Sequence, residues 1–509
     1  MLKATTPVNS SARRYKLAGR FKSIFLIEKL NNKFGLVLLL TCAVLISVGI
    51  AIGHIPFAGL FLGVCISIPL MYCIFAFPEF ALTFLIVLAY FLFELGRWGI
   101  EGPVGTVMDG FQAILIITIL ARQKKENNWR IFDNPVTYVI LFWMGYNIIE
   151  VVNPASISSL AWFYTVRGTA FVQLCYFSFV YYIRSIKMVR FIIKLWILLA
   201  IIGALYGLKQ EYIGFTDTEN AYLHSDPNIE QLLFIAGHWR KFSIFSDPVA
   251  FAYNMAMPGI ICICIMAGPF KLWKKLISIL LFLLYFVSAL YSGTRGASIL
   301  LPAALILFAV LNYSKTVLFY SLLAAFAFIV LIRIPTSNPT IYRFQTAFNP
   351  SKDASYNVRQ RNQKRIQPYY YTHPMGGGLG STGTWGERFA PDSYLAHFPP
   401  DSGYIRVAVE DGWIGLFVFC LMIFVTLKTG IDNFFSIIDP ELKSYCLMAT
   451  LIVFTYNIAN FPQEALVQYP SNILFNLSVA LIVITKRIDS ELQKKNLPAT
   501  NLQLVLEGS

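Results

Sequence analysis

Charged residues are scarce in this sequence. Only 13% of its 509 residues are Asp, Glu, Lys or Arg, whereas 57% are hydrophobic. A soluble domain carries about 25% charged residues, so this chain lacks the charge that would cover a water-facing surface. The high apolar content also excludes intrinsic disorder, which requires low hydrophobicity. The composition therefore predicts a polytopic membrane protein.

Motifs for disulfides, metals and nucleotides are missing as well. The eight cysteines lie in apolar stretches and form no CxxC pair, so we expect neither a disulfide framework nor a zinc site. The sequence contains no HExxH, no GxSxG and no GK[ST] motif. We therefore predict no metal, no cofactor and no nucleic-acid partner. The net charge of +14 is attributed to loops that face anionic membrane lipid.

Apolar segments of membrane-spanning length recur along the whole chain. A span needs about 20 apolar residues. We expect fourteen, at 34–53, 56–77, 79–96, 105–121, 135–152, 161–183, 190–208, 248–267, 275–292, 297–312, 316–334, 413–430, 444–461 and 471–485. The predicted fold class is thus an all-α polytopic membrane protein of about 14 transmembrane helices (12–14), with a long, partly helical outer loop.

Lys and Arg concentrate on alternate connections between these spans, which predicts their sidedness. Because cytoplasmic segments are rich in Lys and Arg, we place the basic arm 1–33 and the tail 486–509 in the cytoplasm. Two long polar segments then fall on the outer side of the membrane. The resulting divisions are a first bundle at 34–208, the first outer loop at 209–247, further spans at 248–334, the large outer loop at 335–412 and the last spans at 413–485.

The large outer loop contains a basic stretch followed by a glycine-rich run. Arg359, Arg361, Lys364 and Arg365 lie close together, and in a helix Arg361 and Arg365 would share a face. Guanidinium groups suit phosphate because they donate two parallel hydrogen bonds and keep their charge. The alternative is a solvated face or a contact with lipid headgroups. The run at 376–380 either brings backbone amides to a ligand or forms ordinary turns.

Three ionisable residues fall inside or at the ends of apolar spans. Arg295 stands at the outer junction of two spans, where an Arg is costly and indicates function. The alternative for Arg295 is an interfacial anchor whose charged end reaches the headgroups. Arg167 lies near the outer end of its own span, and we expect Asp109 to make a polar contact between helices.

Four segments together carry a resemblance to a known family. They are Arg240 to Phe251, the Ser-x-x-Arg-Gly-Ala pattern at Ser292 to Ala297, Arg359 placed fifteen residues before Pro374, and Asp401 to Leu416. The last holds in register Tyr404, Glu410, Gly412, Gly415 and Leu416. Their order and spacing resemble the O-antigen ligase and O-antigen polymerase superfamily of bacterial envelope glycosyltransferases.

The resemblance implies a function and a set of site residues. It implies an enzyme of the bacterial inner membrane that moves a glycan from undecaprenyl diphosphate, at the periplasmic face, to a hydroxyl of a polysaccharide or of the lipid A core. No metal takes part, and Arg295 and Arg359, with Arg361 in reserve, would bind the diphosphate. The ligases carry a His for the acceptor where this chain has Asp401. The catalytic candidates are therefore Asp401 and, second, His397.

Three alternatives remain open at this stage, and one of them is a non-catalytic membrane scaffold that binds envelope polymers. The sequence does not separate a ligase from a polymerase. A transporter or flippase of a lipid-linked oligosaccharide would also suit many spans with basic residues. Transporters, however, often show paired halves with broken helices at mid-membrane, and no such pairing is visible in the sequence.

Overall fold

The structure, a computed structural model, describes residues 73–74, 77–98, 104–235, 237–348 and 354–496, with a few positions between 37 and 48. The predicted span 34–53 and almost all of 56–77 lie outside the described residues. The chain divides into two units, 1–81 and 82–509. In the first unit the described positions are nearly all helical. The second unit contains the features considered below.

The second unit is built almost entirely from helices. In chain order the described elements are α3 (Pro78–Arg97, whose first turn belongs to the first unit), α4 (Val104–Glu126), η2 (Trp129–Phe132), α5 (Pro135–Ile149), η3 (Glu150–Val152), α6 (Ser159–Thr169), η4 (Phe171–Gln173), α7 (Leu174–Tyr182), α8 (Ile186–Tyr212), α9 (Asp217–Leu223), α10 (Pro227–Leu233), β1 (Phe234–Ile235), β2 (His238–Trp239), α11 (Pro248–Ala267), α12 (Leu272–Tyr291), η5 (Arg295–Ile299), α13 (Leu300–Leu311), α14 (Lys315–Arg333), α15 (Pro339–Thr346), α16 (Ala354–Thr372), α17 (Gly383–Phe389), α18 (Gly403–Glu410), α19 (Gly412–Ser436), α20 (Pro440–Ala459) and α21 (Ser471–Asn496). The two short strands pair antiparallel.

The all-α polytopic fold is confirmed. Among the described residues, ten helices are long and apolar enough to cross a membrane. The predicted span 297–312 corresponds to η5 and α13, an apolar helix too short to be one of the ten. The predicted span 161–183 is broken at Ala170, between α6 and η4. Gly168 and Thr169 precede this break, and both residue types have low helix propensity.

Three of the spanning helices begin in the same way. Asn134, Asp247 and Asp439 each accept hydrogen bonds from backbone amides of the first turn, and a Pro follows each of them. Proline suits this position because its fixed φ fits the helix and its missing N–H would have had no partner. The starts of α5, α11 and α20 are therefore determined locally.

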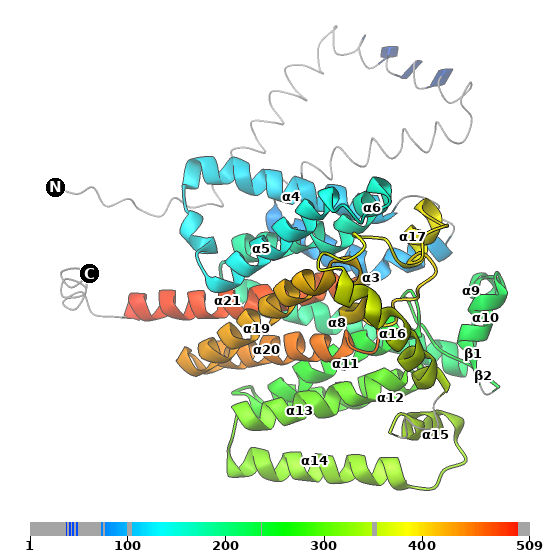
Figure 1. Ribbon diagram of the computed structural model, residues 1–509. Helices are drawn as coiled ribbons and strands as arrows, with labels where there is room; N and C mark the ends of the chain where they lie inside the picture. Colours follow the sequence, from blue (N-terminus) through cyan, green and yellow to red (C-terminus); the bar gives the residue numbers. More distant parts are fainter. Residues whose placement is uncertain are drawn as a thin grey trace. The chain divides into compact units, whose positions relative to one another are not determined.

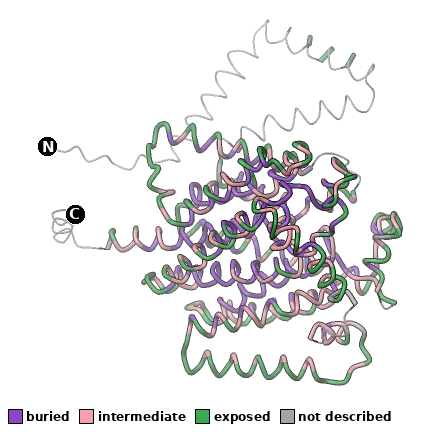
Figure 2. The backbone as a smooth tube through the Cα atoms, in the orientation of Figure 1, coloured by how far each residue is buried: buried purple, intermediate pink, exposed green. Residues whose placement is uncertain are grey.

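Burial is uneven among the helices. The residues of α11, α20 and α21 are mostly buried, whereas α14 has no buried residue (Figure 2). Exposed apolar side chains on α14 include Phe319, Leu322 and Phe326. This exposure is what we expect of a span at the lipid-facing edge of a bundle.

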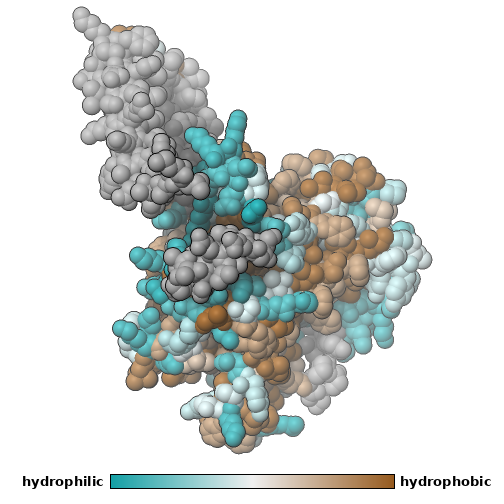
Figure 3. All heavy atoms as spheres, turned by 90° about the vertical axis from the view of Figure 1, so that its left-hand side faces the viewer, coloured by the Kyte–Doolittle hydropathy of each residue, from teal (hydrophilic) through white to brown (hydrophobic). Residues whose placement is uncertain are grey.

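The two long polar segments lie at the same end of the second unit. Figure 1 shows α9, α10 and the strands at the same end as α15, α16 and α17. We call this the loop end. At the opposite end, Arg184 pairs with Glu126 at 2.8 Å and Arg487 donates to the carbonyl oxygens of Val180 and Ile183. Figure 3 views that opposite end, where hydrophilic and hydrophobic side chains are interspersed.

Candidate functional site

The segment that leads into α11 holds Arg240 against the turn after α12. Arg240 donates from Nε to the carbonyl oxygen of Ser292 at 3.0 Å and from Nη2 to Oγ1 of Thr294 at 3.0 Å. The Thr294 hydroxyl donates in turn to the carbonyl oxygen of Pro248 at 3.0 Å. These bonds fix Arg240 beside Arg295, the next residue of the turn.

A second arginine reaches the same turn from α15. Arg343 Nε donates to the carbonyl oxygen of Gly293 at 2.6 Å. Gly293 has a φ of +59°, and a Cβ there would lie 2.9 Å from Arg343 Nε. Only glycine combines this backbone conformation with so close an approach. The turn thus brings Arg240, Arg295 and Arg343 together from three separate segments.

The three guanidinium groups repel one another. Burial and the charge of Arg343 lower the pKa of Arg240 to about 10; Asp247 partly opposes this, and Arg295 adds the smallest lowering effect. Asp247 Oδ1 already accepts hydrogen bonds from the amides of Val249 and Ala250 at the start of α11. An anion bound here would relieve the repulsion, because it would favour the charged form of each arginine.

Arg359 approaches this arginine group from α16. The charge of Arg359 acts on Tyr253 of α11. The Tyr253 hydroxyl lies 3.5 Å from where a Cβ of Gly296, the residue after Arg295, would stand. Arg359 and the turn that holds Arg295 thus both come near Tyr253. We call Arg240, Arg295 and Arg343 the arginine cluster.

The charge of Arg359 also acts on Asp401. Burial raises the pKa of Asp401, while the charge of Arg359 and a hydrogen bond from Asn362 partly oppose the rise. Arg359 and Asn362 are three residues apart on α16 and so share a face. The predicted phosphate-binding residue and the predicted base are thus neighbours across one helix face.

A buried ion network adjoins Asp401. Arg406 of α18 donates to Glu464 at 2.6 Å and to Glu410 at 3.2 Å. Burial alone would lower the pKa of Arg406, but the two carboxylates outweigh burial and raise it. Burial raises the pKa of Glu464, and the charge of Asp401 adds to this rise. Glu410 therefore anchors Arg406 and also accepts a hydrogen bond from the hydroxyl of Thr382.

The remaining predicted site residues lie away from this convergence. Arg361 follows Arg359 by two residues, about 200° around the helix, and is exposed. The side chain of His397 is 71% exposed, and its Nδ1 lies 3.8 Å from Glu387. Arg167 pairs with Asp109, which confirms the polar contact between helices expected for Asp109. The structure places Arg359 near Asp401 and Arg295 in the arginine cluster, whereas Arg361 and His397 are exposed.

The glycine-rich run packs against protein. Gly377 N donates to the carbonyl oxygen of Val409, and Gly378 N donates to that of Glu410, both at 2.9 Å. A Cβ on Gly380 would lie 2.4 Å from Thr165 Oγ1. Of the two interpretations of the run, the structure favours turns that let the loop close on α6 and α18.

Gly412 should be needed for this closure. It has a φ of +71°, and a Cβ there would lie 2.0 Å from the carbonyl oxygen of Pro374. We expect Gly412→Ala to lower the free energy of unfolding by about 3 kcal/mol. Gly383→Ala is the matched control, because Gly383 also has a positive φ but its Cβ would meet nothing closer than 3.7 Å. That control should lose about 1 kcal/mol. Thermal unfolding of the purified proteins checks this, and equal losses would contradict the packing argument.

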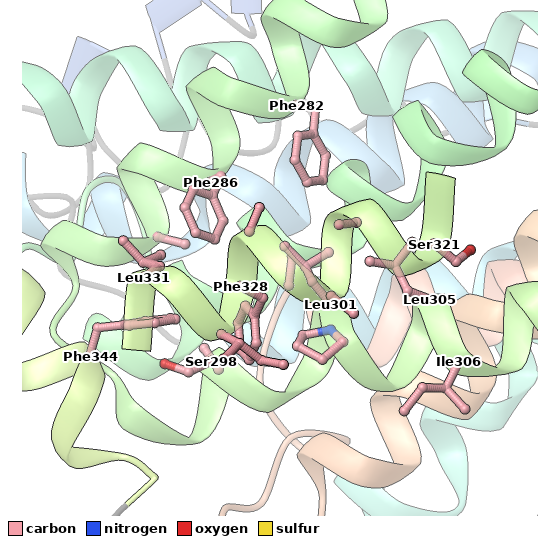
Figure 4. A pocket seen from close by; sticks show the side chains of 18 of the residues that line it. Phe282, Phe286, Ser298, Leu301, Leu305, Ile306, Ser321, Phe328, Leu331 and Phe344 are labelled. Atoms are coloured by element: carbon pink, nitrogen blue, oxygen red, sulfur yellow. The ribbon is translucent and has the colours of Figure 1, made fainter. Parts of the chain in front are cut away.

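An apolar cavity of about 730 Å³ opens beside the arginine cluster. It lies among α12, α13 and α14, and both Arg295 and Arg343 line it. Figure 4 shows its apolar side chains, which include Phe282, Phe286, Leu301, Leu305, Phe328 and Phe344. The site thus joins a cationic end to an apolar chamber at the lipid-exposed edge of the bundle.

Several residues of the site were not assigned from the sequence. No role was predicted for four of them, which are Arg343, Asn362, Arg406 and Glu464. Arg240 belongs to one of the four family-like segments, but the sequence assigned it no function. Its role depends on the turn at Gly293, which lies in a distant segment. The others depend on contacts between distant segments.

Comparison with known proteins agrees with this description. Residues 280–420 match the family model described as O-antigen ligase, and this range includes Arg295, Arg343, Arg359 and Asp401. The chain is also similar to an O-antigen polymerase from Salmonella muenchen, with 23% identity over 398 residues, which cover 74% of this chain and 94% of the relative. Both findings support the superfamily that the motifs predicted.

Proposed function

Taking the chain as a membrane enzyme of the O-antigen ligase or polymerase type, we propose that it transfers a glycan from a polyprenyl diphosphate to an acceptor hydroxyl. The donor would be the undecaprenyl diphosphate-linked glycan. The acceptor would be a polysaccharide chain or the lipid A core. The reaction would take place at the periplasmic face of the bacterial inner membrane, with both termini in the cytoplasm.

One observation carries the proposal: the arginine cluster borders the apolar cavity. An isoprenoid lipid diphosphate has an anionic head and a long apolar tail. Arg295 and Arg343 line the cavity, and Arg240 lies beside them. Apolar side chains of α12, α13 and α14 would cover the first isoprene units. A ligand with this polarity is a better match than a soluble phosphate, which would leave the apolar chamber unused.

In the proposed transfer, Arg359 and Asp401 act on the leaving group and on the acceptor. The acceptor oxygen attacks the anomeric carbon of the glycan, and Asp401 accepts the hydroxyl proton. The bond between the anomeric carbon and the diphosphate oxygen breaks, and the lipid diphosphate leaves with the bonding electrons. Arginine side chains stabilise the negative charge that develops on the leaving group. The charge of Arg359 acts on both Asp401 and Tyr253, which supports a role for Arg359 close to the proposed base.

Deletion of the gene, followed by gel analysis of surface polysaccharide, tests the function. Single repeat units that stay on their lipid carrier and never lengthen would indicate a polymerase. Polymer that accumulates without attachment to its acceptor would indicate a ligase. An unchanged polysaccharide pattern would contradict both, and lipid-linked units retained on the cytoplasmic side would favour a transporter.

A further inference from the structure

α16 has two chemically different faces. The face that packs on the protein contains Arg359, Asn362 and Ile366, and Ile366 is buried against Leu395, Phe398 and Val409. The opposite face contains Arg361, Lys364, Arg365, Pro368 and Tyr371, all exposed. These positions follow the spacing of a single helical stripe. We call this stripe the outer face of α16.

The outer face is basic and has no carboxylates of its own. From Ala354 to Thr372 the sequence of α16 contains four cations and no Asp or Glu. Within the described part of the chain, Arg361, Lys364 and Arg365 form no ion pair. Their charges therefore add up over about 6 Å of helix. A surface of this kind attracts an anionic ligand.

The composition of the outer face argues against lipid headgroups as that ligand. A helix that lies on a membrane buries a continuous apolar face in the headgroup region. Among the described exposed residues of α16, the large hydrophobic ones are only Val358 and Tyr371. α14 has the surface expected of a lipid-facing helix, with exposed apolar side chains such as Phe319 and Phe326 along its length. The ligand of the outer face should therefore be polar.

Tyr371 indicates what kind of polar ligand this is. Its side chain is 65% exposed, and its hydroxyl accepts a hydrogen bond from Gln367 Nε2 at 2.8 Å, which orients the ring. An exposed, oriented aromatic ring offers a flat surface on which the apolar face of a sugar ring can pack. Arg361 and Tyr371 are about 15 Å apart along the helix, a length that only an extended molecule would cover.

We propose that the outer face of α16 binds an acidic glycan, a polysaccharide chain whose sugars carry carboxylates. Arg361, Lys364 and Arg365 pair with the carboxylates, and Tyr371 packs against a sugar ring. The proposal rests on the proposed function, because the helix that carries this face also carries Arg359 to the reaction centre. A chain held here would run alongside the site while its end is presented to Asp401.

Binding can be measured without turnover. The full-length protein is placed in nanodiscs of neutral phosphatidylcholine and titrated with fluorescent oligogalacturonate, with dextran oligomers of equal length as the neutral probe. We expect oligogalacturonate to bind and to weaken as salt is added, and dextran to bind far less. The triple variant Arg361→Gln, Lys364→Gln, Arg365→Gln should bind oligogalacturonate about tenfold more weakly.

Controls separate this inference from its rivals. Arg388→Gln, which removes another exposed outer cation, should leave oligogalacturonate binding unchanged. The double variant Arg361→Lys, Arg365→Lys keeps the charge and should retain most of the binding. Equal binding of oligogalacturonate and dextran, or equal binding by the wild type and the triple Gln variant, would overturn the proposal. A triple Gln variant that binds oligogalacturonate normally but loses binding to phosphatidylglycerol vesicles would also overturn the proposal, because the ligand would then be a lipid headgroup.

A further variant keeps this result distinct from the proposed function. Arg295→Ala should still bind oligogalacturonate as the wild type does, because Arg295 lies in η5 and not on α16. If this variant binds the probe yet makes product at the normal rate, the proposed function fails and the glycan surface stands. If Arg295→Ala makes no product while the triple Gln variant binds oligogalacturonate normally, the proposed function stands and the glycan surface fails.

Discussion

Arg295→Ala and Arg359→Ala should each reduce formation of polymer or ligated product by about 100- to 1,000-fold, the loss seen when one group that stabilises a leaving oxyanion is removed. The physical reason is that the positive charges of the arginine cluster and of Arg359 would stabilise the proposed diphosphate as it leaves. The measurement is the rate of glycan transfer from the lipid-linked donor by purified protein, with membrane content of each variant checked by immunoblot.

Two kinds of control variant accompany these substitutions: lysine at the same positions, and alanine at an arginine outside the cluster. Arg295→Lys and Arg359→Lys should restore only part of the rate, because a lysine keeps the charge but loses the paired donors of the guanidinium group. Arg388→Ala removes an exposed guanidinium at the loop end that lies outside the arginine cluster, and it should be nearly silent. Normal transfer by both alanine variants would remove the proposed diphosphate site.

Asp401→Asn should be the second severe change, with a loss of about 100- to 10,000-fold in transfer rate. The substitution keeps the shape of the side chain and its contact with Asn362 but removes the group that accepts the proton. His397→Ala should cost far less, because His397 is largely exposed and sits beside Glu387. If the two variants rank the other way, the role of base passes to His397.

The pH dependence of the rate tests the same assignment. Burial raises the pKa of Asp401 above its ordinary value near 4. A base works only when deprotonated, so the rate should fall as the pH drops through this raised pKa, at a higher pH than for an exposed carboxylate. The residual rate of Asp401→Asn should lack this acid limb. An acid limb that persists in the variant would point to another group.

The helical fold could be predicted from the sequence because long apolar segments leave a membrane protein few alternatives. The break at Ala170 could not, because Gly168 and Thr169 only weaken the helix locally and the apolar sequence resumes after them. Likewise, helical periodicity places Arg359 and Arg361 on different faces of a helix. This could not be used from the sequence alone, because whether and where the segment is helical was not settled.

The site was predictable in part for similar reasons. Arg295 and Arg359 stood out because charge is rare in this chain and their motifs were recognisable. Arg343 did not, because its place in the cluster depends on the turn at Gly293, fifty residues earlier. The glycine-rich run was ambiguous for another reason: a close contact with a ligand and a close contact with a neighbouring backbone require the same residue type.

The exposure of α14 has a consequence for handling the protein. One wall of the apolar chamber is a helix with no buried residue, so the surrounding bilayer, more than the rest of the polypeptide, holds that wall in place. Extraction into detergent exchanges this support for a fluid micelle and should loosen the chamber while α11, α20 and α21 stay packed. We therefore expect the proposed lipid substrate to bind its apolar tail in this chamber only in preparations that retain native lipid.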